Sequence, residues 1–324
     1  MFKWKKLGKL FDPTTMTDLP WMSHFAQTPS LLTFGDFLRI YFCTRPPADA
    51  NGQFVSRIGF IDVDRDDLFR IRRISREPVL PLGELGTFDE FGTNPVSVIR
   101  DGGEIRAYYA GVTRCESVPF NAAIGLAVST DGGESFQRLG PGPVISYTPA
   151  EPFVIGSPKI RKFGDLWYLH YAAGRNWLQT GGRPEPVYKL RCATSPDGIR
   201  WSKWNRNLIC DRLDEDECQA GGDILFYAGR YHMFFSYRHP VGFKTKGRGY
   251  RIGYSVSDNL IDWTRHDDAA GIDLSEEGWD SEMVSYAHVF QHQGRVFMLY
   301  QGNAIGRCGF GLAVMESYTE RGAS

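Results

Sequence analysis

Four ionisable side chains recur at equivalent places in this 324-residue sequence. Each lies five residues before a proline, glycine or alanine that recurs along the chain, and they are His24, Glu90, Glu217 and Glu282. Carboxyl groups that converge in a partly buried site repel one another, which raises the pKa of at least one of them and makes it a general acid. We therefore predict Glu90, Glu217 and Glu282 as catalytic groups and His24 as a substrate-binding residue.

Each of these residues also has a structural interpretation. Polar residues at the start of inner strands often only satisfy backbone groups, which applies to Glu90 and Glu282. Glu217 ends the acidic run Asp214–Glu217, a pattern typical of a solvated loop. His24 is equally consistent with a hydrogen-bonded core residue. The sequence leaves these alternatives open.

A second recurring set is basic. Four arginines directly follow, or end, aromatic segments of the chain, and they are Arg45, Arg114, Arg175 and Arg238. Polar residues in the same context are His239 and Asn303. A guanidinium binds phosphate or carboxylate bidentately and keeps its charge, so the set predicts an anionic substrate or leaving group. For any single arginine, the alternative is a surface ion pair.

Further binding residues are predicted close to these two sets. They are the polar or aromatic residues of recurring Pro- or Gly-containing steps and of one long loop: Gln27, Asn94, Ser157, Asp223, Tyr286 and Trp177. Trp177 follows Arg175 in that loop, and an indole ring is suited to stacking on a sugar face. No spacing of ligand residues predicts a metal site, and no motif predicts a cofactor.

The elements that must position these residues are strands, because an aromatic strand ending occurs five times. The copies are Arg39–Phe42, Arg106–Tyr109, Trp167–Tyr171, His232–Tyr237 and Val296–Tyr300. Each follows a Gly-containing turn and precedes another strand, so each belongs to a hairpin. Copies about 60 residues apart, without helical periodicity, predict an all-β fold, a five-bladed β-propeller with four-stranded antiparallel blades around a central funnel. A β-sandwich is the alternative, but it gives no reason for fivefold repetition.

We expect residues 1–324 to form a single domain. The blades are expected at about 21–80, 87–145, 150–210, 215–270 and 278–318. Closure of such a ring usually needs a strand from the other end of the chain, because otherwise the last sheet keeps an open edge. Residues 7–11 are expected to supply that strand.

Recurring tripeptides carry a resemblance to known proteins. The steps Gln27-Thr-Pro29, Thr93-Asn-Pro95 and Gly156-Ser-Pro158, with the Ser195-Pro-Asp-Gly198 turn before Trp201, resemble the five-bladed propellers of glycoside hydrolase families 32, 43 and 130. The likeness covers essentially the whole chain. It implies a carbohydrate-active propeller whose site lies in the central funnel.

The resemblance to family 32 is incomplete at the catalytic positions. The segment Trp21–Pro29 is similar to the motif that supplies a nucleophilic Asp but contains no carboxylate, and Ser157 stands where the stabilising Asp is found. Glu217-Cys218 is similar to the motif that carries the general acid. One acid combined with cationic groups resembles the family 130 phosphorylases, in which phosphate is the nucleophile.

Composition excludes several other classes. The net charge of −1 gives no basic surface for nucleic acid. The basic segment Met1–Leu7 is not followed by an apolar run, and no stretch approaches the length of a membrane span, so neither a signal peptide nor a span is expected. The six dispersed cysteines indicate reduced thiols and a cytoplasmic protein, with a Cys210–Cys218 disulfide as the alternative.

Three functions follow from these observations. The favoured one is an enzyme that cleaves or forms a glycosidic bond with an anionic co-substrate, as a glycoside phosphorylase or a glycosyltransferase does. The alternatives are an inverting glycoside hydrolase, with Glu90 or Glu282 as the base, and a non-catalytic carbohydrate-binding propeller. The expected partner is a small carbohydrate, and a phosphorylated or nucleotide-linked sugar is one form that it can take. The sequence predicts no oligomeric state.

Overall fold

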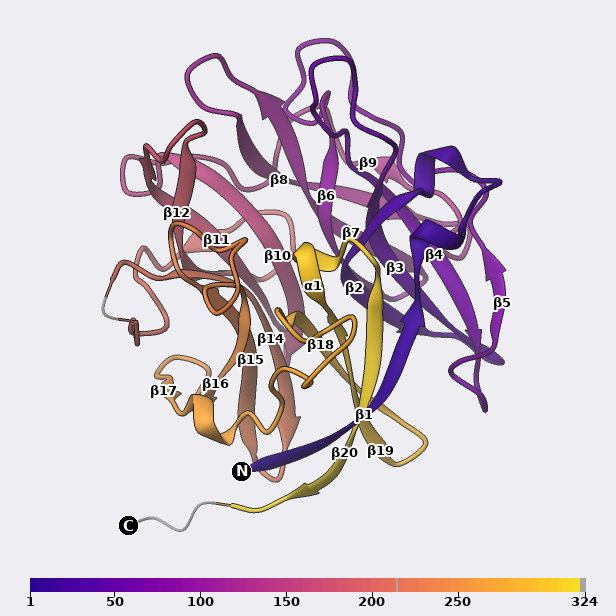
Figure 1. Ribbon diagram of the computed structural model, residues 1–324. Coiled ribbons are helices and arrows are strands. Elements are labelled where there is room, and N and C mark those ends of the chain that lie inside the picture. Colours follow the sequence, from indigo (N-terminus) through magenta and orange to yellow (C-terminus); the bar gives the residue numbers. More distant parts are fainter. Residues whose placement is uncertain (214, 321–324) are drawn as a thin grey trace.

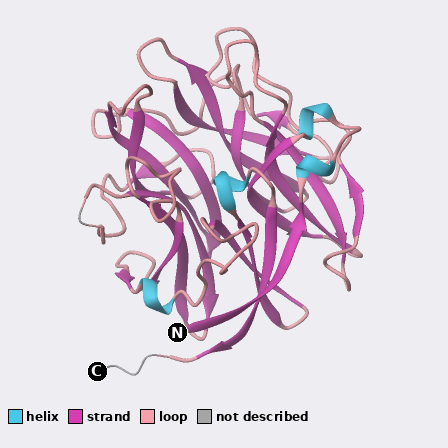
Figure 2. Cartoon of the chain, viewed as in Figure 1, coloured by secondary structure: helices cyan, strands magenta, loops and turns pink. Residues whose placement is uncertain are grey.

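The computed structural model describes residues 1–213 and 215–320 and forms a ring of five four-stranded antiparallel sheets (Figure 1). The predicted all-β five-bladed propeller is confirmed. Helices are confined to short turns between strands (Figure 2): the 3₁₀ turns Pro13–Thr15, Pro20–Met22 and Asp267–Ala269, and α1, Asn303–Gly306. Among the described residues, no helix has the length and apolar character needed to cross a membrane.

Each sheet is one blade, with strands given from the innermost to the outermost. Blade 1 contains β2 (His24–Thr33), β3 (Phe37–Arg45), β4 (Arg57–Asp64) and β5 (Ile71–Ile74). Blade 2 contains β6 (Thr93–Asp101), β7 (Glu104–Arg114), β8 (Phe120–Ser129) and β9 (Gln137–Arg138). Blade 3 contains β10 (Phe153–Phe163), β11 (Leu166–Leu178), β12 (Glu185–Ser195) and β13 (Ser202–Lys203). Blade 4 contains β14 (Cys218–Tyr227), β15 (Arg230–Arg238), β16 (Arg251–Ser257) and β17 (Thr264–Arg265). Blade 5 contains β18 (Ser285–His292), β19 (Arg295–Gln301), β20 (Phe310–Tyr318) and β1 (Phe2–Phe11).

The two ends of the chain meet in blade 5. β1 pairs antiparallel with β20, from Phe2 opposite Tyr318 to Phe11 opposite Phe310. The two strands lie side by side in Figure 1. The strand begins at Phe2, earlier than the Leu7 expected from the sequence. Its pairing covers the edge of β20, so that the last sheet has the same four strands as the others.

The aromatic strands are the second strands of the blades, and they are buried on both faces. In β7, Tyr109 packs toward blade 1 with Phe60, while Tyr108 packs toward blade 3 with Trp167 and Leu169. A strand buried on both faces has no polar side, which explains a continuous apolar run instead of alternation. The hydrophobic core is therefore a set of layers between neighbouring blades.

A glycine turn anchors one blade to the next. The Tyr108 hydroxyl donates to the carbonyl of Gly198 at 2.8 Å, in the Ser-x-Asp-Gly turn of blade 3. Gly198 has a φ of +75°, and a Cβ on it would lie 2.6 Å from the Tyr108 hydroxyl oxygen. Only glycine meets both conditions. The turn recognised in the sequence is therefore a contact between blades.

Every innermost strand contains a bulge at the same place. The register with the second strand shifts at residues 27–30, 93–96, 156–159, 220–223 and 285–288. Four bulges contain a residue in the left-handed region, and these are Thr28, Ser157, Gly221 and Tyr286. Blade 2 has the cis Asn94–Pro95 bond there instead. A bulge re-aims the side chain that it contains, and these are the tripeptide steps seen in the sequence.

Directly after the bulges, side chains link each of several innermost strands to the innermost strand of the neighbouring blade. Ser30 accepts a hydrogen bond from the backbone nitrogen of Val98 at 3.0 Å, and Ser97 accepts one from Ile160 at 3.1 Å. Asp223 and His288 occupy the same position in blades 4 and 5 and accept from Val289 at 2.8 Å and Leu31 at 3.1 Å. We call these bonds the axial ring. They fix the inner strands to one another beneath the bulges.

Candidate functional site

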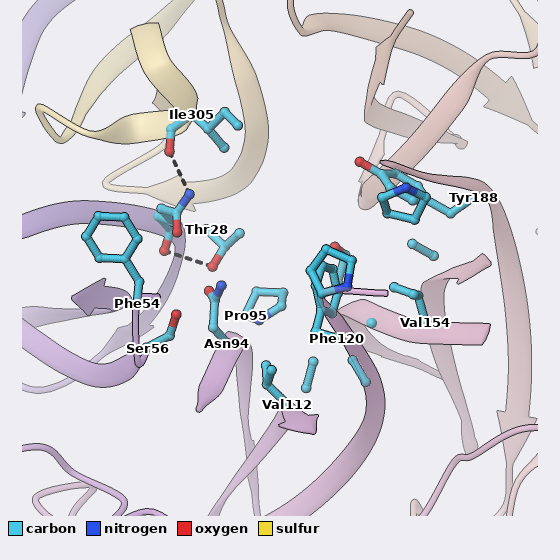
Figure 3. Close-up of a pocket in the computed structure, with 18 of the residues that line it drawn as sticks. Thr28, Phe54, Ser56, Asn94, Pro95, Val112, Phe120, Val154, Tyr188 and Ile305 are labelled. Atoms are coloured by element: carbon cyan, nitrogen blue, oxygen red, sulfur yellow. Dashed lines mark hydrogen bonds between the residues drawn. The ribbon is translucent and has the colours of Figure 1, made fainter. Parts of the chain in front are cut away.

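A cavity of about 370 Å³ opens where the innermost strands converge. All five blades contribute to its wall. Figure 3 shows Thr28 and Phe54 on one side of this space and Tyr188 on the other. Cavities of a few hundred Å³ with an apolar lining and a few polar groups are typical ligand sites. This cavity is the candidate functional site.

The bulges supply one wall position in each blade. Thr28, Asn94, Ser157 and Tyr286 line the cavity from blades 1, 2, 3 and 5. Blade 4 has Gly221 at its bulge, where a Cβ would lie 2.8 Å from the Tyr286 ring. The backbone irregularity of the inner strands thus turns their side chains toward a shared space.

Arg45 ends β3 and faces the cavity without an acidic partner in the described part of the chain. Its Nη2 donates to Gln27 Oε1 at 2.9 Å, and its guanidinium lies 4.5 Å from the centre of the Phe25 ring. Gln27 in turn donates to the carbonyl of Ile305 at 2.6 Å. Burial lowers the pKa of Arg45 from 12.5 to about 10, and the positive charge of Arg183 acts in the same direction.

Arg238 ends β15 and is still more enclosed, with 3% of its surface exposed. Its Nε donates to the Tyr188 hydroxyl at 3.2 Å, and its Nη1 donates to the carbonyls of His239 and Pro240 at 2.8 and 3.1 Å. The guanidinium lies 3.8 Å from the centre of the Phe243 ring. Within residues 1–213 and 215–320, no carboxylate pairs with it.

Three tyrosines surround the end of the cavity near Arg238. The hydroxyls of Tyr188 and Tyr250 are in hydrogen-bond contact, and the Tyr250 and Tyr286 rings lie 5.6 Å apart. Burial raises the pKa of all three phenols above the ordinary value, so they stay protonated at neutral pH. They are neutral hydroxyl groups next to an uncompensated cation.

Two more arginines and one acid complete the charged lining. Arg114 donates to Asp49 at 2.6 Å, while Arg183 is exposed in the loop before β12. Glu185, the first residue of β12, is the one carboxylate among the described residues that line the cavity. The lining contains four arginines, of which Arg114 is paired with Asp49, and one carboxylate, so its net charge is positive and it favours anions.

Phenylalanine rings supply most of the apolar lining. The rings are those of Phe54, Phe91, Phe120 and Phe243. Trp177 packs edge-on against Phe120, with ring centres 5.7 Å apart, and is not itself among the residues that line the cavity. Aromatic faces next to hydrogen-bonding groups are suited to binding sugar rings.

Seven of the residues singled out in the sequence line the cavity together, and they are Gln27, Arg45, Asn94, Arg114, Ser157, Arg238 and Tyr286. They come from the bulges and from the ends of the second strands. The structure therefore brings together most of the predicted arginines and most of the predicted bulge residues. It does not bring the three predicted catalytic carboxyl groups into this lining.

Glu217 is fully buried directly before β14, and it is not among the residues that line the cavity. Its Oε1 accepts from Arg265 at 2.7 Å and from Gln219 at 3.0 Å. Its Oε2 accepts from the backbone nitrogens of Arg212 and Leu213 at 3.2 and 3.3 Å. Both oxygens of this carboxyl group thus have hydrogen-bond donors within the protein. The expected solvated acidic run is also not found at Glu217, and Asp214 lies outside the described residues.

The same arrangement recurs in three other blades. A buried acid that precedes the innermost strand binds a base on the outermost strand, and we call this pair the blade clip. The pairs are Asp89 with Arg138, Glu151 with Lys203, Glu217 with Arg265 and Asp280 with Lys6. In three of them a tyrosine of the second strand also donates to the acid: Tyr109, Tyr171 and Tyr300. The recurring acid of the sequence therefore forms an ion pair within its own blade.

Glu90 and Glu282 lie next to or near clip acids and outside the cavity lining. Glu90 is half-buried and accepts from the backbone nitrogen of Gly86 at 2.9 Å. Glu282 is exposed, and its backbone nitrogen donates to Asn303 Oδ1 at 2.8 Å. A fixed count of five residues back from the bulge residue ends at Glu90 and Glu282 and so misses the clip acids Asp89 and Asp280. The reason is that the connections to the inner strands differ in length.

Four predicted binding residues also have other roles. His24 contacts the hydroxyl of Ser23, and Asn303 holds the turn before β18 through the backbone nitrogens of Glu282 and Met283. The remaining two are paired with acids at the surface: Arg175 with Asp216 at 3.3 Å, and His239 with Glu215. None of the four is among the residues that line the cavity.

Asp223 belongs to the axial ring. It is 1% exposed and binds Arg161 at 2.8 Å, while His288 lies 3.3 Å away. Burial opposes its ionisation, but the positive charges of Arg161 and Lys159 hold its pKa well below the ordinary value. Its carboxylate is thus used within the ring, below the cavity that it was expected to line.

The sequence interpretation missed the parts of the site that come from loops. Arg183, Glu185, Tyr250, Phe54 and Phe243 lie in, or directly after, the connections between second and third strands. These connections are long in several blades, and long loops on one propeller face often bind ligands. That signal could have been applied to all blades, as it was to Trp177. In the described part of the chain, no group of three or more His, Cys, Asp or Glu side chains is placed to hold a metal ion.

The fold and the cavity define a five-bladed propeller with an arginine-rich central site. Several solved structures have the same fold. A solved structure named "Glycoside hydrolase" superposes with a TM-score of 0.75 at 17% identity. The match covers all of this chain and 95% of that chain. A thermostable family-43 glycoside hydrolase gives 0.62 at 14% identity over 93% and 92% of the chains, and the β-1,2-mannobiose phosphorylase of Listeria innocua gives 0.66 at 13% over 97% and 96%. The resemblance to these propeller families is confirmed at the level of fold.

Sequence comparison identifies the family. The chain is 34% identical over 315 residues to the "Uncharacterized protein MT1551" of Mycobacterium tuberculosis, covering 97% of this chain and 99% of that protein. It therefore belongs to the same family as this mycobacterial protein. A β-1,2-mannobiose phosphorylase of Thermoanaerobacter sp. is 23% identical over 178 residues, 52% of this chain and 54% of that protein. No protein-family model matches the chain.

Proposed function

We propose that this protein is a carbohydrate-active enzyme that cleaves or forms a glycosidic bond with an anionic co-substrate. Its reaction is that of a glycoside phosphorylase or a related glycosyl transfer. Two of the proteins that share its fold or part of its sequence are named β-1,2-mannobiose phosphorylases, which supports this class of substrate. Because fold alone does not define a reaction, the proposal depends on the cavity.

The observation that carries the proposal is the charge of the cavity. Four arginines and one carboxylate line it, and Arg45 and Arg238 lack any acidic partner in the described chain. A buried cation without a counter-ion is costly, and an anionic ligand removes that cost. A neutral disaccharide and water would leave both guanidinium groups uncompensated.

The one carboxylate of the lining suits an acid role. In the cleavage direction, an oxygen of hydrogen phosphate attacks the anomeric carbon while the bond from that carbon to the glycosidic oxygen breaks. The leaving oxygen takes a proton from Glu185, and the proton of the attacking hydrogen phosphate returns to Glu185 through water. The products are a sugar 1-phosphate and a free alcohol. The arginines position the phosphate and balance its charge.

An inverting hydrolase is supported less well by the same lining. That mechanism needs a second carboxylate to activate water, at about 6.5–9.5 Å from the acid. Glu185 has no such companion among the described lining residues. Phosphate brings its own negative charge, so a single protein acid is sufficient.

The proposed setting is the cytoplasm, where phosphate and sugar phosphates are abundant. All six cysteines are free, including Cys210 and Cys218, as is usual for proteins that remain in a reducing compartment. The proposal treats residues 1–324 as one domain, since blade 5 is built from both ends of the chain.

Phosphate dependence of turnover tests the proposal. The protein is incubated with β-1,2-mannobiose and a panel of other disaccharides, with and without phosphate, and sugar 1-phosphate is measured. The reverse reaction is followed as phosphate released from sugar 1-phosphates in the presence of acceptor sugars. Turnover that requires phosphate supports the proposal. Cleavage at the same rate without phosphate would make the protein a hydrolase, and ligand binding without any turnover would make it a binding protein.

A further inference from the structure

We propose that the cavity contains two separate anion subsites, so that the sugar itself carries a negative group in addition to the anionic co-substrate. This inference rests on the proposed function and narrows its substrate to anionic sugars, meaning sugar phosphates or sugar acids. It follows from two buried guanidinium groups that lie apart and that are each uncompensated.

The first subsite is built around Arg238 in blade 4. This side chain is 97% buried, and its protein partners are one hydroxyl and two carbonyl oxygens, all of them neutral. Phe243 covers one face of the guanidinium, so the charge is held in a fixed plane. The Tyr188 and Tyr250 hydroxyls stand beside it as protonated groups. Together they offer a cation and neutral donors to one oxyanion.

The second subsite is built around Arg45 in blade 1. Its Nε is buried and has no hydrogen-bond partner, while its Nη2 is occupied by Gln27. Arg183 is close enough for its charge to disfavour the charged form of Arg45. Two like charges that form no ion pair with a described acid are stabilised by an anion bound beside them. The lowered pKa of Arg45 is thus consistent with a site that binds a negatively charged group.

The two subsites are separated by the architecture of the ring. Blade 1 and blade 4 are not neighbours, because blade 5 lies between them on one side and blades 2 and 3 on the other. Thr28 from blade 1 and Tyr188, the partner of Arg238, stand on opposite sides of the cavity in Figure 3. Arg45 and Arg238 therefore come from different walls of the cavity, and we infer that each binds its own anion.

Exposure assigns the two anions. Arg183 is exposed, so the Arg45 subsite is reached from the mouth and suits a co-substrate that enters and leaves freely. Arg238 is enclosed by phenol and phenylalanine rings, which suit a sugar ring bound with its own anionic substituent pointing inward. A phosphate ester and a carboxylate share the chemistry that this subsite recognises.

Inorganic phosphate is the first probe, with stoichiometry measured by isothermal titration calorimetry on the full chain. We expect two phosphates per wild-type chain, one per chain in both R238M and R45M, and none in the double variant. Arg230→Met, at the opposite end of the strand that carries Arg238, is the matched control and should bind two. A single phosphate that both variants abolish would overturn the inference and leave the proposed function intact. If the wild-type protein binds no phosphate, both the two-subsite inference and the proposed function are wrong.

Competition with sugars is the second arm and identifies the anionic group. Glucose 6-phosphate, glucuronate and glucose are each titrated against phosphate-loaded protein, and the panel is repeated with the mannose and galactose series. An anionic sugar should displace one phosphate from wild type and from R45M, with at least a tenfold weaker effect on R238M. If sugar phosphates bind more tightly than sugar acids, the group recognised by Arg238 is a phosphate ester. If sugar acids bind more tightly, it is a carboxylate. The assignment would be overturned if the neutral sugar displaced phosphate as well as the anionic sugars do. It would also be overturned if none of the anionic hexoses displaced phosphate.

A fold control keeps the variants interpretable. R238K retains the positive charge but not the planar fork, so it should keep phosphate binding with an affinity reduced about tenfold or more. If R238M does not fold, R238K and the wild-type stoichiometry still decide between one subsite and two.

Discussion

Arg238 and Glu217 are both almost fully buried charges, yet their surroundings are opposite. Glu217 has Arg265 as a counter-ion and four hydrogen bonds, so its charge is satisfied inside the protein. Arg238 has three hydrogen bonds to neutral oxygens and no described acid. Removing one partner of a satisfied buried ion pair is strongly destabilising, whereas a buried charge without a counter-ion is a candidate for binding a ligand.

Replacement of Glu185 tests the proposed acid. Glu185→Gln removes the proton donor but keeps the shape of the side chain, so turnover should fall about 100-fold or more. Steady-state kinetics with the phosphate-dependent substrate measures the loss. A sugar with a leaving group that needs no proton should be turned over almost normally by the variant, since only protonation is lost.

The control for this variant is Glu104→Gln. Glu104 is exposed at the start of β7, and its replacement should leave turnover unchanged. If Glu185→Gln retains full turnover, or loses it equally with both kinds of leaving group, Glu185 is not the acid.

His170 gives the fold a pH dependence that can be measured. It is fully buried next to Lys159, with no partner for either ring nitrogen in the described structure, and burial lowers its pKa from 6.5 to about 4. The unfolded chain takes up a proton near 6.5 but the folded chain does not, so this contribution to stability is complete above that pH and is lost as the pH falls toward 4. Between about pH 7.5 and about pH 5 the loss should be roughly 2 kcal/mol.

Urea unfolding of wild type and His170→Leu at a series of pH values isolates this effect. The variant should show a shallower fall of the unfolding free energy over this interval, because the leucine does not titrate. His266→Leu, at a half-buried histidine after β17, should follow the wild-type dependence. Parallel curves for wild type and His170→Leu would mean that His170 is not held neutral in the folded state.

Among the elements, the blade clip is the repeated unit that links the inner and outer strands. An acid and a base that lie far apart in the sheet are joined at four of the five blades, with Tyr109, Tyr171 and Tyr300 adding a hydroxyl in three of them. Because a clip is buried, the loss of one member leaves an uncompensated charge.

Glu217→Gln and Glu151→Gln should therefore behave alike. Each leaves a clip base without its counter-ion, and each should lower the free energy of unfolding by about 3 kcal/mol, the low end for a broken buried pair. Chemical denaturation measures this, with activity normalised to the folded fraction. Normal specific activity with reduced stability is expected for both. A large loss of activity without a loss of stability in Glu217→Gln alone would restore it as a catalytic group.

How much of this was accessible from the sequence depends on the element. The aromatic strands repeat because each must be buried on both faces, so the periodicity of Tyr41, Tyr109, Tyr171 and their equivalents predicts the ring. The bulge tripeptides and the arginines after the second strands also predict most of the wall. Local patterns of this kind are set by packing that recurs in every blade.

The catalytic assignments were not accessible in the same way. Whether a carboxylate faces a cavity or an arginine on the outermost strand depends on a pairing between distant segments, such as Glu217 with Arg265. The equivalent acids Asp89, Glu151 and Asp280 form the same kind of ion pair, but their offsets from the bulge differ by one or two residues. Glu185 and Arg183 reach the site from a loop whose course no periodicity describes.

For the whole molecule, the pairing of β1 with β20 decides whether the ring is closed. Trp4 is 8% exposed, packs against Phe234 of blade 4 at 5.6 Å, and donates to the carbonyl of Ala270 at 3.0 Å. The first strand of the chain thus connects blade 5 to blade 4 as well as completing its own sheet.

Trp4→Ala should destabilise the protein by about 3 to 5 kcal/mol, as large aromatic truncations in a core do. Thermal unfolding should still occur in one transition, because every blade is packed between two others. Lys5→Ala, at the exposed neighbouring position of the same strand, is the control and should shift stability little. A second, earlier transition in Trp4→Ala would show that blade 5 can open while the other four remain folded.

The bulges have a consequence for how such a site diversifies. Thr28, Asn94, Ser157, Gly221 and Tyr286 occupy one place in five copies of the same backbone detour, while the bonds that hold the inner strands together lie just below them. Exchange of the side chains of Thr28, Asn94, Ser157 and Tyr286 changes the chemistry of the wall, whereas Gly221 is restricted because a Cβ there would lie 2.8 Å from the Tyr286 ring. Recognition and architecture are thus encoded by neighbouring but independent residues, and a descendant of this chain can acquire a new ligand by a handful of point mutations.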